Sequence, residues 1–126
     1  MIDRLDHIVL TTKDKSRCIA FYVDLLGMQL ETFGEGRIAF KFGQQKINLH
    51  EAGKEFLPKA QLPTPGSLDL CFIVGIALDL VIARLQESNW PIEQEPVLRT
   101  GAVFKLRSIY LRDPDLNLIE ISERAE

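Results

Sequence analysis

The stretch "LDHIVLTTKDKSRCIAFYVDLLGM" (residues 5–28) decides the order of structure in the first half of the chain. Its first eight residues alternate in polarity and are rich in β-branched side chains, which predicts a strand. Apolar residues then recur with helical spacing, at Ile19, Tyr22, Val23 and Leu26. Gly27 stands where a left-handed residue is expected to end that helix. Three short strands are expected next, at about 28–33, 37–43 and 46–52, so the order is β-α-β-β-β.

The same order restarts after residues 52–67, a segment with three prolines, two glycines and no clear period. A strand is expected at 68–74. A helix is expected at 78–90, and its apolar residues are Leu78, Val81, Ile82 and Leu85. Three strand-like stretches follow, at 92–98, 104–112 and 116–122. The second half therefore has the β-α-β-β-β order of the first.

Aligning the two halves indicates an internal repeat. Displacing the first half by 62 positions places His7 on Asp69. The same displacement places Gly27 on Asn89, and Gly and Asn are the two residue types best suited to a left-handed helix cap. Both predicted helices therefore end in register.

For the last strands the displacement grows to 72 and places Asn48 on Glu120. We therefore predict an α+β fold in one domain that covers residues 1–126. It would consist of two tandem βαβββ modules, at about 3–53 and 67–124, joined by a connector at 54–66. Packed with pseudo-twofold symmetry, the first and last strands of both modules would surround one concavity.

Composition narrows the classes of function. The chain has 126 residues and a net charge of -3, with no run of Lys or Arg, so nothing indicates a nucleic-acid partner. No apolar stretch approaches the roughly 18 residues that a membrane span needs. The cysteines, Cys18 and Cys71, are far apart and are expected to be small buried thiols. A cytoplasmic protein without membrane contact is the simplest interpretation.

The repeat predicts that four polar residues converge: His7 and Asp69 from the two first strands, and Asn48 and Glu120 from the two last strands. Each lies among apolar neighbours, and a carboxylate is costly to bury unless it is paired or bound to a metal. A histidine with carboxylates and open positions suits a divalent ion, namely Fe, Mn, Ni, Co or Zn. Such an ion would act as a Lewis acid towards a bound carbonyl.

Each of these residues also has an ordinary structural explanation. Strand alternation can point Glu120 to solvent, and a single histidine such as His7 is more often a hydrogen-bonded structural residue. Asp69 can cap a turn, and Asn48 can bond a neighbouring backbone group. The metal interpretation rests on the equivalent positions of these residues in the repeat.

Cationic residues of the second half form a separate set, namely Arg99, Lys105 and Arg107. They can bind an anionic substrate, such as the carboxylate of glutathione or a phosphonate. A solvated strand edge explains them equally simply. Both explanations stay open on the sequence.

Three motifs resemble the vicinal oxygen chelate superfamily, which includes glyoxalase I, extradiol dioxygenases, fosfomycin-resistance proteins and bleomycin-binding proteins. They are "LDHIVL" (5–10), "FYVDLLGM" (21–28) and "YLRDPDLNLIEIS" (110–122). The resemblance covers essentially the whole chain. It implies a cupped, half-barrel mixed sheet around a metal-binding pocket. The stretches "FGQQKINLHEAGKEFLPKA", "PGSLDLC" and "RTGA" are similar to the glyoxalase domain-containing protein 5 group and its bacterial virulence-associated relatives.

By this resemblance His7 and Glu120 occupy metal-ligand positions, and Asp69 falls where most members carry histidine. Asn48 falls where glyoxalase I carries a glutamate that is both ligand and base. Asparagine cannot replace that base, because its amide takes up no proton near neutral pH. His50, on the same strand face, is the candidate for base or fourth ligand, since its unperturbed pKa is near 6.5.

The resemblance therefore implies a metal-dependent lyase or isomerase of the lactoylglutathione lyase type. Its substrate would be a small carbonyl compound or its thiol adduct, with glutathione as one such thiol. Glu120 and His50 are the predicted catalytic residues, and Asn48 is predicted to contact substrate. The alternatives are an extradiol-type dioxygenase, an antibiotic thiol transferase and a non-catalytic module of the bleomycin-binding type. A homodimer is expected.

Overall fold

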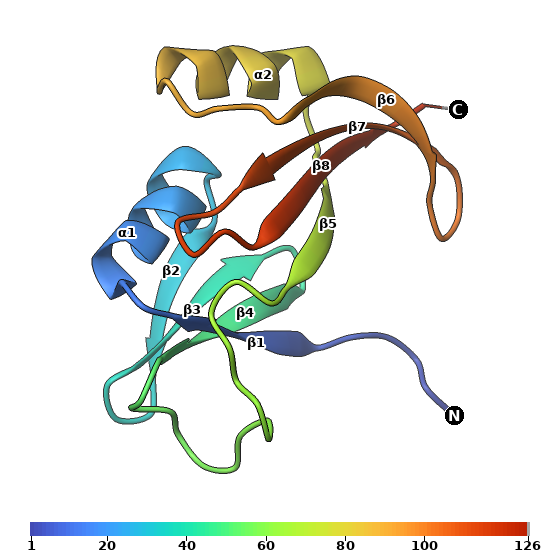
Figure 1. The fold of residues 1–126 in the computed structure, drawn as a ribbon. Helices are drawn as coiled ribbons and strands as arrows, with labels where there is room; N and C mark the ends of the chain where they lie inside the picture. The colour runs from blue at the N-terminus through green and yellow to red at the C-terminus, as the bar shows by residue number, and fades with distance from the viewer. Residues whose placement is uncertain (126) are drawn as a thin grey trace. The chain divides into compact units, whose positions relative to one another are not determined.

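The computed structural model describes residues 1–125 and divides the chain into two compact units. The first runs from Met1 to Ser67, and the second begins at Leu68. Each unit contains one four-stranded sheet (Figure 1). The predicted α+β fold with two βαβββ modules is confirmed.

The first unit contains β1 (His7–Thr12), α1 (Lys15–Ile19), a π-helical segment η1 (Ala20–Leu25), β2 (Gln29–Phe33), β3 (Arg37–Phe42) and β4 (Gln45–Glu51). Its strand order is β1-β4-β3-β2. The first and last strands, β1 and β4, run parallel, and the other neighbours are antiparallel. Parallel pairing of β1 with β4 is possible because a helix and two strands connect them.

The helix of the first unit is wider than a regular α-helix at its end. Asp14 caps its start by accepting a hydrogen bond from the backbone N–H of Arg17. Near its end the N–H of Leu26 bonds the carbonyl of Phe21, five residues back, and Gly27 has a φ of +80° as predicted. The additional residue per turn changes the spacing of the buried side chains. Of the predicted apolar stripe only Tyr22 is buried.

The core of the first unit lies between this helix and one face of the sheet. Leu10, Phe40 and Ile47 are completely buried, and the ring of Tyr22 stacks on Phe40 with a centroid distance of 5.2 Å. Strand residues alternate between faces, so the other face of this sheet carries the polar residues of β1 and β4. We call this second surface the polar face.

The second unit contains β5 (Asp69–Ile73), α2 (Leu78–Glu87), β6 (Gln94–Thr100), β7 (Lys105–Arg112) and β8 (Leu118–Arg124). Its strand order is β5-β8-β7-β6, and β5 runs parallel to β8. In α2 three residues of the predicted apolar face are buried, namely Leu78, Val81 and Leu85, and the fourth, Ile82, is half-buried.

Both ends of α2 are held by specific contacts. The carboxylate of Glu123 accepts a hydrogen bond of 2.8 Å from the N–H of Leu78, replacing the missing side-chain cap at Ala77. At the other end Asn89 has a φ of +55°, as the alignment with Gly27 predicts.

Strand register supports the internal repeat at the level of single residues. His7 lies opposite Lys46 in the β1–β4 ladder, and Asp69 lies opposite Leu118 in the β5–β8 ladder. The displacements of 62 and 72 carry the first pair onto the second. The two units therefore place equivalent residues on equivalent faces.

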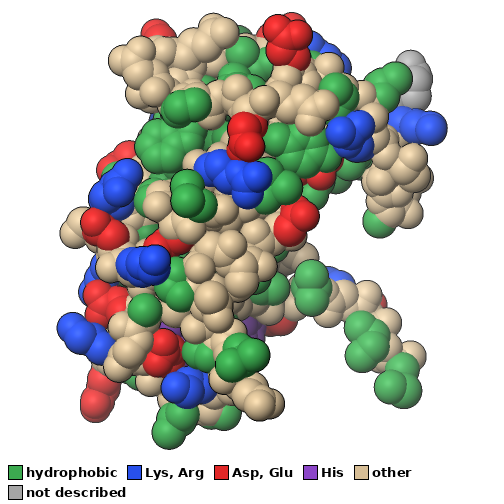
Figure 2. All heavy atoms as spheres, viewed as in Figure 1, with side chains coloured by type: hydrophobic (Ala, Val, Ile, Leu, Met, Phe, Trp, Pro, Cys, Tyr) green, Lys and Arg blue, Asp and Glu red, His purple; other side chains and the backbone are tan. Residues whose placement is uncertain are grey.

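No helix of residues 1–125 is long and apolar enough to cross a membrane. On the side drawn in Figure 2, basic and acidic side chains of the described residues are interspersed. Such mixing of charge is typical of a solvated protein surface.

Candidate functional site

The polar face of the first unit presents residues from neighbouring strands in rows. Thr11 on β1 lies opposite His50 on β4. Asn48 lies between Val9 on β1 and Ala39 on β3. Paired residues in a ladder point to the same side of a sheet, so these side chains share one surface.

Two side chains on this face are buried without the hydrogen bonds they need. Asn48 is 5% exposed and His50 is 3% exposed. Among the described residues, Asn48 Oδ1 and His50 Nε2 are the two buried side-chain polar atoms that lack a partner. A buried polar atom left unpaired costs about 1–3 kcal/mol. A pair of them on one strand face therefore indicates a binding surface.

The connector covers part of this face. Phe56 packs edge-on against the ring of His50, with centroids 5.6 Å apart, and the guanidinium of Arg37 lies 4.9 Å from the Phe56 centroid. Burial lowers the pKa of His50, the charge of Arg37 lowers it further, and Glu55 acts in the opposite direction. His50 is therefore a neutral imidazole near pH 7.

His7 lies at the exposed start of β1, on the polar face but away from His50. Its Nδ1 lies 2.9 Å from Asp6 Oδ1. This hydrogen bond is the first cause of the lowered pKa of Asp6. A carboxylate that holds one ring nitrogen leaves the other, Nε2, free to bind a metal.

The equivalent surface of the second unit carries Asp69, Cys71 and Glu120. Cys71 lies opposite Glu120 in the β5–β8 ladder, and Asp69 is two residues earlier on the same face. Ser122 Oγ lies 3.4 Å from a carboxylate oxygen of Glu120, 2.7 Å from the Ser108 hydroxyl and 3.4 Å from the Cys71 sulfur. The two carboxylates are thus diagonal neighbours beside a short chain of hydroxyls.

The exposure of Cys71 differs from the prediction, because the thiol was expected to be buried. Alternation along β5 explains the difference. Asp69, Cys71 and Ile73 lie on the exposed face, and Leu70 and Phe72 take the other. Cys18 is buried as predicted.

The three predicted substrate-binding cations do not lie together. Arg107 lies on the face opposite Glu120, where it bonds Asp79 and Glu123 at 3.1 Å each. These contacts hold α2 to the sheet and engage the guanidinium. The substrate-binding role of Arg107 stays a prediction, for a guanidinium that already bonds two carboxylates.

Arg99 and Lys105 have different surroundings. Arg99 donates a hydrogen bond of 2.9 Å to the hydroxyl of Tyr110, and Tyr110 lies opposite Glu120 in the β7–β8 ladder. Arg99 therefore shares the face of Glu120. Lys105 lines a separate cavity of about 490 Å³ together with Phe104 and Arg124.

The predicted metal ligands are divided between the two units, with His7 in the first and Asp69 and Glu120 in the second. Among residues 1–125 no three His, Cys, Asp or Glu side chains gather into a group that could hold a metal ion. The individual donors nevertheless suit a divalent ion, since His7 offers an open ring nitrogen and Glu120 an ionisable carboxylate.

Two functional candidates on the polar face escaped the sequence reasoning. Arg37 stands at the start of β3, and only the strand register shows that it shares a surface with His50. Phe56 lies in the connector, a segment without a clear period, and its place beside the His50 ring follows only from the structure. Thus the connector contributes directly to the surroundings of a predicted site residue.

Comparison with known proteins confirms the resemblance seen in the sequence. The family model described as the Glyoxalase/Bleomycin resistance protein/Dioxygenase superfamily matches residues 4–121. Virulence protein STM3117 of Salmonella typhimurium is 51% identical over 98% of this chain and 85% of its own length. Glyoxalase domain-containing protein RDO1 of Mycosarcoma maydis is 52% identical over 94% of this chain and 66% of its own length.

Solved structures agree with the fold. The crystal structure of STM3117 matches with a TM-score of 0.96 and covers 99% of both chains at 50% identity. A lactoylglutathione lyase from Agrobacterium tumefaciens matches with a TM-score of 0.75 at 22% identity, covering 98% of this chain and 95% of its own. At that identity the second likeness concerns the fold alone.

Proposed function

Because the chain belongs to the Glyoxalase/Bleomycin resistance protein/Dioxygenase superfamily, we propose that it is a metal-dependent lyase or isomerase of the glyoxalase type. Its substrate is a small carbonyl compound or the thiol adduct of one, such as a glutathione adduct. The observation that carries this proposal is the shared register of the two units. It gives His7 and Asn48 the same positions on their sheet as Asp69 and Glu120 have on theirs.

The proposed metal ligands are His7, Asp69 and Glu120, and the ion is Zn, Ni, Co, Mn or Fe in the divalent state. The bond between Asp6 and His7 Nδ1 supports this assignment, because it orients the imidazole and leaves Nε2 for coordination. Bound there, a divalent ion would supply Lewis-acid polarisation of a substrate carbonyl.

The protein's own side chains supply positioning and proton transfer in this proposal. Asn48 cannot take up a proton, so its amide orients substrate. His50 is held neutral by burial and by Arg37, and its unpartnered Nε2 can accept a proton from the substrate carbon next to the carbonyl. Glu120 is the second predicted proton acceptor, and its carboxylate is oriented by the hydroxyl of Ser122.

A second candidate function is ligand binding without catalysis. The unpartnered atoms of Asn48 and His50 favour it, because a bound small molecule would satisfy both without any chemical step. The family description includes bleomycin resistance proteins alongside glyoxalases and dioxygenases.

Turnover of aldehyde–glutathione adducts by chelator-treated protein, back-titrated with each of the five metals, tests the proposal. We expect activity only after metal addition, with a large loss in Glu120→Gln. Glu123→Gln is the matched control, since Glu123 lies on the same strand but on the opposite face. Activity that survives both chelation and Glu120→Gln would refute the metal-dependent function. Binding of the adducts without turnover under any metal would support the second candidate instead.

A further inference from the structure

One row of the polar face crosses the whole sheet of the first unit. It contains Thr11 on β1, His50 on β4, Arg37 on β3 and Phe33 on β2. Thr11 lies opposite His50, and Phe33 lies opposite Arg37. The β3–β4 ladder pairs Ile38 with Leu49, so Arg37 is the next residue in register with His50. Neighbouring strands are about 4.8 Å apart, which brings the two side chains within reach of one ligand.

Arg37 carries a charge that no carboxylate of residues 1–125 neutralises. Its guanidinium carbon lies 4.9 Å from the ring centroids of both Phe33 and Phe56. No acidic side chain of residues 1–125 lies within ion-pair distance of it. Aromatic rings attract the cation but accept no strong hydrogen bond, so the planar fork of donors remains available to an anion.

The neighbouring cation on this face shows a different arrangement. Lys46 lies 3.5 Å from the carboxylate of Glu31 and 3.9 Å from the Phe33 centroid. Its charge is therefore balanced within the protein. Arg37 is held in place by rings on two sides and left without a counter-ion, which is typical of a residue that recognises an anion.

Arg37 requires an anionic group in the ligand, and Asn48 requires a hydrogen-bond donor. Asn48 Oδ1 can only accept a hydrogen bond, so the group that satisfies it must be a donor such as a hydroxyl. Arg37 and Asn48 are diagonal neighbours across the β3–β4 ladder, so their Cβ atoms are about 7–8 Å apart or somewhat less. One small ligand can therefore contact both side chains.

We propose that the polar face of the first unit binds a small hydroxy-carboxylate, with Arg37 holding the carboxylate and Asn48 Oδ1 accepting from the hydroxyl. His50 Nε2 faces the same group, and Phe56 covers it. The hydroxy-carboxylate is the substrate class of the proposed catalytic site. The proposed function is needed only for the reaction that follows binding. Recognition of the anion requires neither metal nor turnover.

Binding of glycolate to chelator-treated protein tests the inference, measured by calorimetry and by the shift of the His50 ring proton in NMR. Glycolamide removes the negative charge from the probe, and acetate removes the hydroxyl. We expect saturable millimolar binding of glycolate and at least tenfold weaker binding of both analogues. Equal affinity for glycolate and glycolamide would overturn the anion site, and equal affinity for acetate would overturn the role of Asn48.

Arg37→Gln is expected to weaken glycolate binding at least tenfold in a protein that still unfolds cooperatively, with a small loss of stability from the two cation–π contacts. Lys41→Gln is the matched control, because Lys41 lies on the same strand and face two rows away and should change affinity less than twofold. Equal losses in both variants, or none in Arg37→Gln, would contradict the inference. Glycolate binding without turnover of any adduct would refute the proposed function alone. Turnover of a neutral adduct without glycolate binding would refute this inference alone.

Discussion

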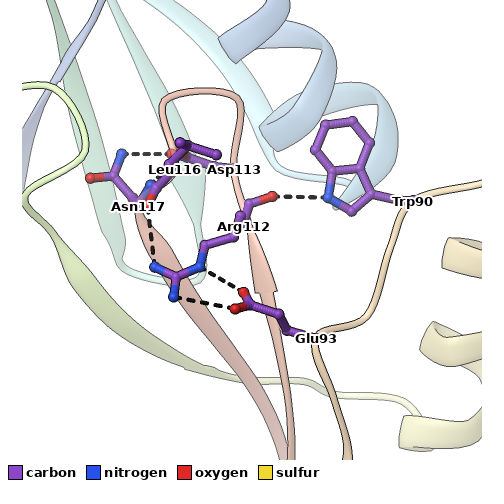
Figure 3. A network of polar contacts seen from close by, with 6 residues as sticks. All are labelled: Trp90, Glu93, Arg112, Asp113, Leu116 and Asn117. Carbon is purple, nitrogen blue, oxygen red and sulfur yellow. Dashed lines mark hydrogen bonds and ion pairs between the residues drawn. The ribbon is translucent and has the colours of Figure 1, made fainter.

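Asn117 fixes the register of the two strands that carry Asp69 and Glu120. The side chain is 1% exposed. Its Nδ2 donates to Asp113 Oδ2 at 2.8 Å, the contact drawn in Figure 3, and its Oδ1 accepts from the N–H of Leu68 at 2.8 Å. Leu68 immediately precedes Asp69, so one amide holds the start of β5 to the turn that leads into β8.

Replacing Asn117 by alanine removes two hydrogen bonds, one to the Leu68 N–H and one to Asp113 Oδ2. A hydrogen bond to a charged group contributes about 1.5–3 kcal/mol, and a buried donor that loses its partner costs about 1–3 kcal/mol. Because the Leu68 N–H is only partly buried and regains some water, we predict a loss of about 3 kcal/mol in the free energy of unfolding. At the size of this chain that corresponds to a drop of about 10 °C in melting temperature.

Urea denaturation at pH 7, followed by circular dichroism, measures this loss. Asn117→Asp serves as a second variant, because it keeps the acceptor for Leu68 but sets a carboxylate against Asp113. Its deficit should shrink as the pH falls from 7 to 4 and the pair takes up a proton. A loss below about 1 kcal/mol for Asn117→Ala, or a pH-independent deficit for Asn117→Asp, would refute the reasoning.

Three further outcomes are expected. Asn48→Ala should lower the free energy of unfolding by less than about 1 kcal/mol, because Oδ1 of Asn48 has no hydrogen bond to lose. The same variant should bind glycolate more weakly. A loss of stability as large as that of Asn117→Ala would contradict this expectation. Burial and the charge of Arg37 lower the pKa of His50 in the folded protein below its value in the unfolded chain, against the opposing charge of Glu55. The unfolded chain therefore takes up a proton first as the pH falls. The contribution of His50 to the free energy of unfolding is full above pH 6.5 and declines below it by at most about 1.4 kcal/mol per pH unit. His50→Asn should flatten this decline in urea titrations from pH 7.5 to 5, and an unchanged profile would count against it. Light scattering is expected to give twice the chain mass of 14.3 kDa, and a monomer would refute the homodimer.

The repeat explains why much of the fold was predictable from sequence. The caps at Gly27 and Asn89 follow from two residue types that tolerate positive φ, and both were found as expected. The buried face of α2 follows a regular period. The buried face of α1 and η1 does not, because the π-helical turn at Leu26 depends on packing that no local pattern encodes.

The candidate site was harder to predict from sequence than the fold. The face on which a strand residue lies, and the residue it pairs with, depend on how the strands assemble in the folded protein. Arg99 and Arg107 look equivalent along the chain, yet Arg99 shares the face of Glu120, and Arg107 bonds Asp79 of α2 on the opposite face. No sequence pattern around Arg37 indicates a binding role, and its place beside His50 follows only from the pairing of β3 with β4. Asn48 and His50 stand out only in the structure, where Asn48 Oδ1 and His50 Nε2 are buried without hydrogen-bond partners.

The central claim is that Glu120 helps to hold a divalent metal ion that the reaction requires. The most direct measurement is the metal content per chain, by elemental analysis after chelation, reconstitution and removal of unbound ion. We predict one ion per chain in the unaltered protein and in Glu123→Gln, and less than a tenth of that in Glu120→Gln. Equal metal content in the two variants, or none in the unaltered protein with any of the five metals, would contradict the account.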